Sequence, residues 1–149
     1  NITDVSLYRT QVSGDVSVFE QNPKLVKLNL MVCSKIKGNI EVFQATPNLV
    51  NLNLRACKKI EGDIAVFRFC PNITDVSLFR TQVSGNVQVF EHNPNLTELN
   101  LFCCEEIEGD ISVFEFCPNV TDVILGGTKV TGNVQVFEHN PNLTELNLF

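Results

Sequence analysis

Two histidines are the clearest candidates for acid–base or metal chemistry in this chain. His92 and His139 lie in two copies of the segment Glu-His-Asn-Pro, two repeat units apart. Paired strands lie about 4.8 Å apart, so that separation predicts about 9–10 Å between them, too far for one metal ion. No serine, cysteine or acid is placed to use either histidine as a base, and no glycine-rich phosphate motif occurs. We therefore expect surface histidines, with no catalytic residue, metal site, cofactor or enzyme activity.

The six cysteines raise the question of disulfides: Cys33, Cys57, Cys70, Cys103, Cys104 and Cys117. Three of them (33, 57 and 104) share a repeat position with threonines, which predicts small inward side chains that contact backbone groups. Those at 70 and 117 are two units apart, too far to pair, and the neighbours 103 and 104 should point to opposite faces. A bond between Cys33 and Cys57, on adjacent coils, stays open. We expect mostly reduced thiols, which favours an intracellular compartment.

Asparagine-linked glycosylation is the contrary signal. Five Asn-x-Thr sequons begin at Asn1, Asn72, Asn95, Asn119 and Asn142. All share one repeat phase, so duplication has copied one event, and their Asn and Thr also suit a turn into a strand. In a secreted chain they would carry glycans, so an extracellular location is the alternative.

Composition limits the class of protein. The chain has 149 residues, 44% hydrophobic, with 17 acidic and 11 basic side chains and a net charge of −6. This charge argues against nucleic acid as a partner, because phosphate binding needs clustered Lys and Arg. No apolar run approaches the ~20 residues of a membrane span. The sequence opens without Met or a signal peptide and within a repeat, so we expect a segment of a longer chain.

An internal repeat dominates the sequence. All six prolines share one phase, with spacings of 24, 24, 23, 24 and 23 residues. The predicted units of one array are 1–23, 24–47, 48–71, 72–94, 95–118, 119–141 and a partial 142–149. Such a unit cannot bury its apolar side chains alone, but stacked units bury them as continuous ladders.

The ladders predict where the strands lie. Two leucine or valine columns two residues apart, as at Leu28 and Leu30, mark the inward face of one short strand per unit. We expect parallel strands near 4–8, 27–31, 51–55, 75–79, 98–102, 122–126 and 145–149, joined by right-handed connections. The Ile-x-x-Phe spacing on the return leg, as at Ile111 and Phe114, favours short turns or 3₁₀ pieces over a second long strand.

The pattern Leu-x-x-Leu-x-Leu-x-x-Cys/Thr resembles the leucine-rich repeat family along the whole chain. Units of 23 residues with Thr10, Thr81 or Thr128 resemble the plant-type repeat, and those of 24 residues resemble the cysteine-containing type. The Val-Phe after the shared glycine departs from the plant pattern and is loosely similar to algal and protist arrays. The resemblance implies an α/β solenoid, with a parallel sheet on a concave face that binds partners and short turns or 3₁₀ pieces on the convex face.

Outward strand positions give the candidate binding residues. Aromatic residues, Met and Arg follow the last strand leucine, and an acidic column precedes it. Such side chains anchor protein interfaces, although stacking along the sheet also accounts for them. The candidates are Tyr8, Arg9, Met31, Arg55, Asp75, Phe79, Arg80, Glu98 and Phe102.

We interpret the segment as a non-catalytic module that binds a protein partner on this face. Residues 1–75 carry a net charge of +2 and residues 76–149 carry −8, which suits steering of a dipolar partner or a second copy. The alternative is a structural spacer or assembly subunit in a larger complex, its uncapped ends covered by neighbours or by head-to-tail self-association. A sensor array attached to an enzyme elsewhere in the chain is a third reading.

Overall fold

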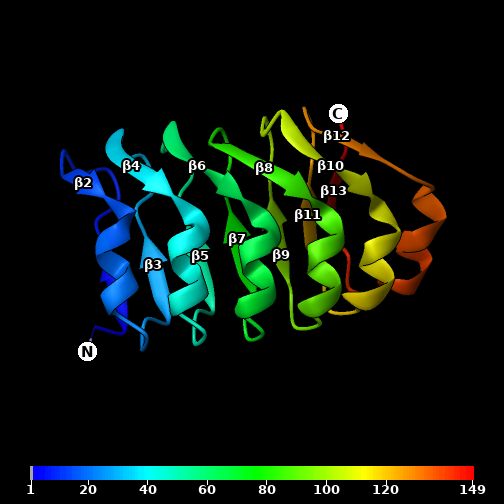
Figure 1. Ribbon diagram of the computed structural model, residues 1–149. Coiled ribbons are helices and arrows are strands. Elements are labelled where there is room, and N and C mark those ends of the chain that lie inside the picture. The colour runs from blue at the N-terminus through cyan, green and yellow to red at the C-terminus, as the bar shows by residue number, and fades with distance from the viewer. Residues whose placement is uncertain (1) are drawn as a thin grey trace.

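The leucine ladders form a seven-stranded parallel sheet in the computed structural model, which describes residues 2–149 (Figure 1). Its strands follow chain order: β1 (Asp4–Ser6), β3 (Lys27–Asn29), β5 (Asn51–Asn53), β7 (Asp75–Ser77), β9 (Glu98–Asn100), β11 (Asp122–Ile124) and β13 (Glu145–Asn147). The central residue of each strand lies opposite the residue at the equivalent position of the next coil, as Val76 lies opposite Leu99. This register confirms the expected ladder.

The regular strands are shorter than expected, but their hydrogen bonds continue further. The N–H of Leu30 donates to the carbonyl of Asn53 at 2.8 Å, and the N–H of Val32 donates to Arg55 at 2.8 Å. Val32 adopts a left-handed backbone with φ 62°, as do the equivalent residues of other coils. The left-handed residue turns the chain away from the sheet, which ends each strand early.

A second sheet corrects the expectation of one strand per coil. Six short parallel strands form it: β2 (Ser13–Asp15), β4 (Lys35–Asn39), β6 (Lys59–Asp63), β8 (Gln82–Asn86), β10 (Glu106–Asp110) and β12 (Lys129–Thr131). In β4, β6, β8, β10 and β12 the inward residue is an Ile or Val, such as Ile60, which is fully buried. Stacking places these extended segments beside those of the next coil with an offset of two residues, as Gly62 pairs with Val83. They therefore hydrogen-bond, although each is too short to be recognised by alternation.

Short 3₁₀ helices complete each coil, as the return-leg spacing predicted. They are η1 (Val16–Gln21), η2 (Ile40–Ala45), η3 (Ile64–Phe69), η4 (Val87–His92), η5 (Ile111–Phe116) and η6 (Val134–His139). An Asp or Asn caps each start; Asp63, for example, accepts the N–H of Ala65 at 2.8 Å. The proline two residues after each helix restricts the residue before it, which stops the helix at six residues. In Figure 1 the helices lie in front of the seven-stranded sheet.

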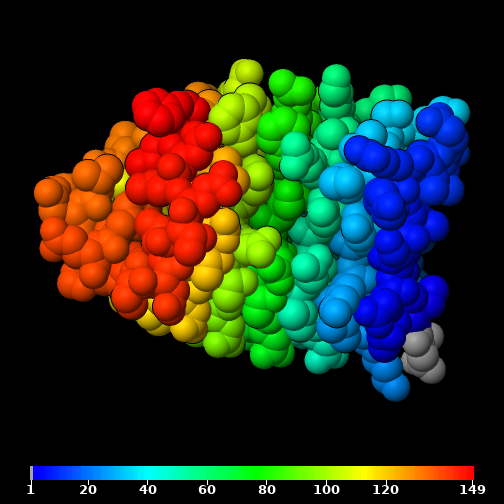
Figure 2. All heavy atoms as spheres, turned by 180° about the vertical axis from the view of Figure 1, so that it is seen from behind, coloured from blue at the N-terminus to red at the C-terminus, as the bar shows by residue number. Residues whose placement is uncertain are grey.

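The core lies between the seven-stranded sheet and the helices. Phe43, Phe67, Phe90 and Phe114 are completely buried along one ladder. Burial falls at the final coil: Val87 is 0% exposed, whereas Val134, at the same position of an identical segment, is 56% exposed. Seen from the sheet side, the coils follow one another as bands in chain order (Figure 2). The core residues of each coil are therefore shielded from solvent mainly by the coils on either side.

Polar side chains inside the stack bond the backbone of the preceding coil. The thiol of Cys57 donates to the carbonyl of Leu30 at 3.0 Å, and that of Cys104 donates to Leu78 at 3.0 Å. The amide of Asn93 donates to two carbonyls of the coil before it, both at 3.0 Å, while its buried Oδ1 has no hydrogen-bond partner. These contacts confirm the expectation that such cysteines point inward and bond backbone groups. All six cysteines are free thiols.

Candidate functional site

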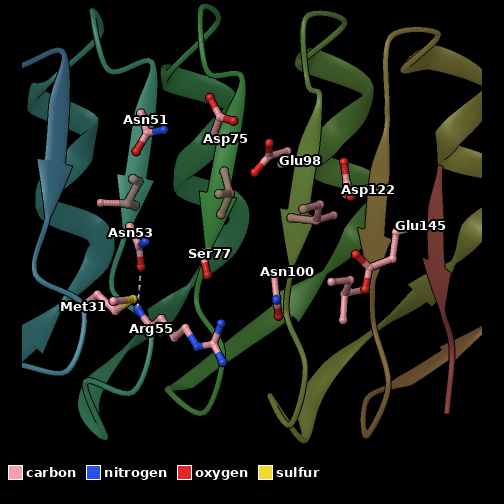
Figure 3. A pocket seen from close by; sticks show the side chains of 14 residues that line it. Met31, Asn51, Asn53, Arg55, Asp75, Ser77, Glu98, Asn100, Asp122 and Glu145 are labelled. Atoms are coloured by element: carbon pink, nitrogen blue, oxygen red, sulfur yellow. Dashed lines mark hydrogen bonds between the residues drawn. The ribbon is translucent and has the colours of Figure 1, made fainter. Parts of the chain in front are cut away.

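A shallow hollow of about 300 Å³ crosses the outer face of the seven-stranded sheet (Figure 3). We call this outer face of the seven-stranded sheet, with the hollow in it, the sheet face. The hollow is lined by Met31, Asn51, Leu52, Asn53, Arg55, Asp75, Val76, Ser77, Glu98, Leu99, Asn100, Asp122, Ile124 and Glu145. Strand alternation produces it: the central residue of each strand points inward, so its two neighbours point outward. Because the strands are in register, equivalent outward residues form rows across the sheet.

The first row is acidic. Asp75, Glu98, Asp122 and Glu145 lie directly opposite one another on β7, β9, β11 and β13. Figure 3 shows the first three of these side chains in a line across the strands. Among residues 2–149 the ion pairs are His92 with Glu91 and Lys129 with Glu106, so no cation pairs with this row. Like charges directly opposite in a sheet repel each other, which leaves the row electrostatically unsatisfied.

Glu98 shows the effect of this crowding. Partial burial and the adjacent carboxylates of Asp75 and Asp122 raise its pKa above the usual value. The two aspartates each accept a hydroxyl hydrogen bond, from Thr74 and Thr121, whereas the glutamate receives none. Of these three carboxylates, Glu98 is therefore the one that gains most from a cation.

The second row consists of amides and a hydroxyl, and it was not predicted from the sequence. Asn53, Ser77 and Asn100 follow the inward strand residue. Each asparagine uses its Oδ1 to accept the N–H two residues later: Arg55 donates to Asn53 and Phe102 donates to Asn100, both at 3.2 Å. The Nδ2 groups are thus the free donors of the hollow. The periodic Asn on a strand, where Asn is disfavoured, was the available signal.

The third row is a shelf of long and aromatic side chains beside the hollow. The rings of Phe79 and Phe102 stack with centroids 5.7 Å apart. The guanidinium groups of Arg55 and Arg80 lie 4.6 and 5.0 Å from the centroid of the Phe79 ring. These contacts hold the shelf in one arrangement, since stacking and cation–π attraction both depend on geometry.

The structure divides the nine predicted residues between the hollow and its surroundings. Met31, Arg55, Asp75 and Glu98 line the hollow. Phe79 and Phe102 form the shelf beside it, with Arg80 on the Phe79 ring. Tyr8 and Arg9 belong to the first coil, beyond the strands that line the hollow, and both are exposed.

The sequon residues serve the turns into the strands. Thr97 donates its hydroxyl to the carbonyl of Thr74 at 3.0 Å, and Thr144 donates to the carbonyl of Thr121 at 3.1 Å. The asparagines at 72, 95, 119 and 142 are exposed, and Asn1 lies outside the described residues. The threonine of the sequon therefore has a structural role between coils.

The histidines show no convergent chemistry. His92 and His139 are exposed at the ends of η4 and η6. Within residues 2–149, no group of three or more His, Cys, Asp or Glu side chains is arranged to hold a metal ion. In the same part of the chain, no helix has the length and apolar character needed to cross a bilayer.

The family models and solved structures place this geometry among known proteins. The model described as "Leucine Rich repeat" matches residues 92–111. No curated protein sequence matches the chain. Among solved structures, the Arabidopsis receptor kinase HAESA, in complex with the peptide hormone IDA and the co-receptor SERK1, is similar with a TM-score of 0.79 and 18% identity. That match covers 99% of this chain and 26% of the receptor chain.

Two further solved structures share the fold. The complex PEPR1–AtPEP1 is similar with a TM-score of 0.80 and 18% identity, covering 99% of this chain and 21% of that one. Internalin C2 from Listeria monocytogenes is similar with a TM-score of 0.58 and 17% identity, covering 99% of this chain and 81% of the internalin. The chain thus spans less than a third of the length of the HAESA and PEPR1 chains.

Proposed function

This chain is a leucine-rich-repeat protein, and from that premise we propose that it is a non-catalytic recognition module that binds a protein or peptide on its sheet face. The observation that carries the proposal is the sheet face, where two rows of outward side chains line the hollow and the shelf of Phe79 and Phe102 lies beside it. Aromatic residues, Met and Arg are the side chains enriched at protein interfaces. The similar structure of HAESA, in complex with the peptide hormone IDA, supports the same kind of role.

The rows suit recognition because they offer different chemistry on one surface. The shelf supplies apolar area that is already fixed by stacking, so binding loses little side-chain freedom there. The acidic row and the free Asn amides supply charge and hydrogen bonds that select the partner.

The test is selection of a displayed random 12-residue peptide library on the 149-residue chain, followed by affinity measurement on variants. Phe79→Ala with Phe102→Ala removes the shelf, and we expect it to weaken selected peptides at least tenfold, because aromatic anchors carry much of the energy of an interface. Thermal unfolding verifies that the variant remains folded.

Phe69→Ala with Phe116→Ala is the matched control. These two phenylalanines are 44% and 52% exposed at the ends of η3 and η5, outside the sheet face. We expect this control to retain affinity. Peptides that lose affinity in the control but not in the shelf variant would place recognition elsewhere and overturn the proposal.

A further inference from the structure

We infer that the partner presents an extended basic segment, with Lys or Arg at every third residue, which lies across the strands with its cations on the acidic row. This inference rests on the proposed function and adds to it the chemistry and conformation of the ligand. Three properties of the sheet face support it: its charge, the shape of the hollow and the spacing of its side chains from strand to strand.

Charge complementarity identifies the ligand as cationic. The row carries four carboxylates on adjacent strands, and no basic side chain within residues 2–149 forms an ion pair with any of them. The nearest basic residue in the row, Lys27 on β3, is separated from Asp75 by Asn51 on β5. Cations from a partner would relieve repulsion that the chain does not relieve itself.

The shelf directs cations toward the acidic row. Two guanidinium groups, of Arg55 and Arg80, already lie over the Phe79 ring. A further cation there would meet two like charges, so the shelf favours apolar residues, including proline. A ligand that carries both basic and apolar residues would therefore place its basic side chains on the acidic row and its apolar side chains on the shelf.

The period of the sheet matches an extended ligand. Neighbouring strands are about 4.8 Å apart, so the four carboxylates span about 14 Å. Carboxylates two strands apart lie about 9.6 Å from each other, so the row holds two cations at that interval. Polyproline II backbone rises about 9.3 Å in three residues. Asn53 and Asn100 are also two strands apart, so their free amides repeat at the same interval to meet ligand carbonyls.

The shape of the hollow favours the same conformation. A volume of about 300 Å³ spread over the strands from Met31 to Glu145 makes the hollow shallow and narrow. A shallow hollow suits a single extended chain better than an α-helix, which has a diameter of about 10–12 Å with its side chains.

Three fluorescein-labelled peptides test the inference against the full 149-residue chain by fluorescence anisotropy in 0.05 and 0.15 M salt. The first repeats Arg-Pro-Pro four times, the second has the same composition with its four arginines in one block, and the third is an alanine-rich helix carrying four arginines. We expect the first to bind at least tenfold more tightly than the other two.

Charge-neutral variants connect that binding to the acidic row. Glu98→Gln with Asp122→Asn should weaken the Arg-Pro-Pro peptide at least tenfold. Glu105→Gln with Glu108→Gln removes the same charge at β10, away from the hollow, and should weaken it less than twofold. Salt will reduce all of these affinities, but it should not change their order.

Each other outcome overturns the inference. Equal affinity for the two arginine-proline peptides, equal loss in both charge variants, tighter binding of the helix, or no binding in 0.05 M salt contradicts it. Library peptides that need the Phe79 and Phe102 shelf but contain no spaced cations would leave the proposed function standing while this inference fails. Library peptides that ignore the shelf would contradict the proposed function itself.

Discussion

At the scale of single residues, the buried thiols show how strongly the stack shields its interior. Burial raises the pKa of Cys70 to about 12, and it does the same for Cys117. Both thiols donate weakly to carbonyls of the preceding coil, as at 3.4 Å from Cys117 to Phe90. They are therefore held neutral and unreactive, unlike the half-exposed Cys103, which remains open to reagents.

The raised thiol pKa predicts alkaline destabilisation. Above about pH 9 the unfolded chain releases these protons while the folded chain keeps them, so the free energy of unfolding falls as pH rises toward 12. We expect about 1 kcal/mol lost per thiol by pH 10, measured by urea unfolding from pH 7 to 10. Cys70→Ala with Cys117→Ala should reduce this dependence, whereas Cys103→Ala should leave it unchanged. An equal slope in all three proteins would contradict the prediction.

At the scale of elements, the shared glycine joins the second sheet to the helix caps. Gly62 on β6 has φ +115°, and a Cβ there would overlap the Asn39 side chain that caps η2. The cap and the glycine belong to adjacent coils, so one contact fixes a helix start and the stacking distance together.

Gly62→Ala should therefore destabilise the chain for two reasons, backbone strain and overlap with the cap. We expect about 2–4 kcal/mol, checked by urea unfolding. Gly14→Ala is the control, because that glycine also has positive φ, +146°, but a Cβ there meets nothing within 4 Å. The control should cost about 1–2 kcal/mol; equal losses would show that the cap contact is unimportant.

Sequence predicted the elements whose signals lie within one unit. The inward leucines gave the main sheet, and the Ile-x-x-Phe spacing gave the 3₁₀ helices. The second sheet was missed because strands such as β2 (Ser13–Asp15) have three residues and exist only through pairing with the next coil. The free amides of Asn53 and Asn100 were missed because their orientation depends on a bond to the turn backbone. The acidic row could be predicted from the sequence, but the lack of ion-pair partners for its carboxylates could not.

At the scale of the whole molecule, stability should vary along the stack because each coil depends on its neighbours. The identical segments 85–102 and 132–149 make this measurable. Leu96 and Leu143 donate equivalent hydrogen bonds, at 3.0 and 3.1 Å, yet the first is fully buried and the second only partly.

Amide exchange followed by NMR tests this directly. Identical local sequence gives the two leucine amides the same intrinsic exchange rate, so their ratio reports structure alone. We expect the Leu96 amide to exchange at least about 100-fold more slowly than that of Leu143. Equal rates would mean that the stack opens as one cooperative unit.

The two identical segments also have a consequence for inheritance. They begin 47 residues apart, a distance of two whole coils, so misaligned recombination between them would add or remove 47 residues without shifting any strand out of register. Each such event would change the length of the stack by about 9.6 Å. The repeated sequence would thus allow the protein to be resized in fixed steps of two coils, each of which keeps the ladders continuous.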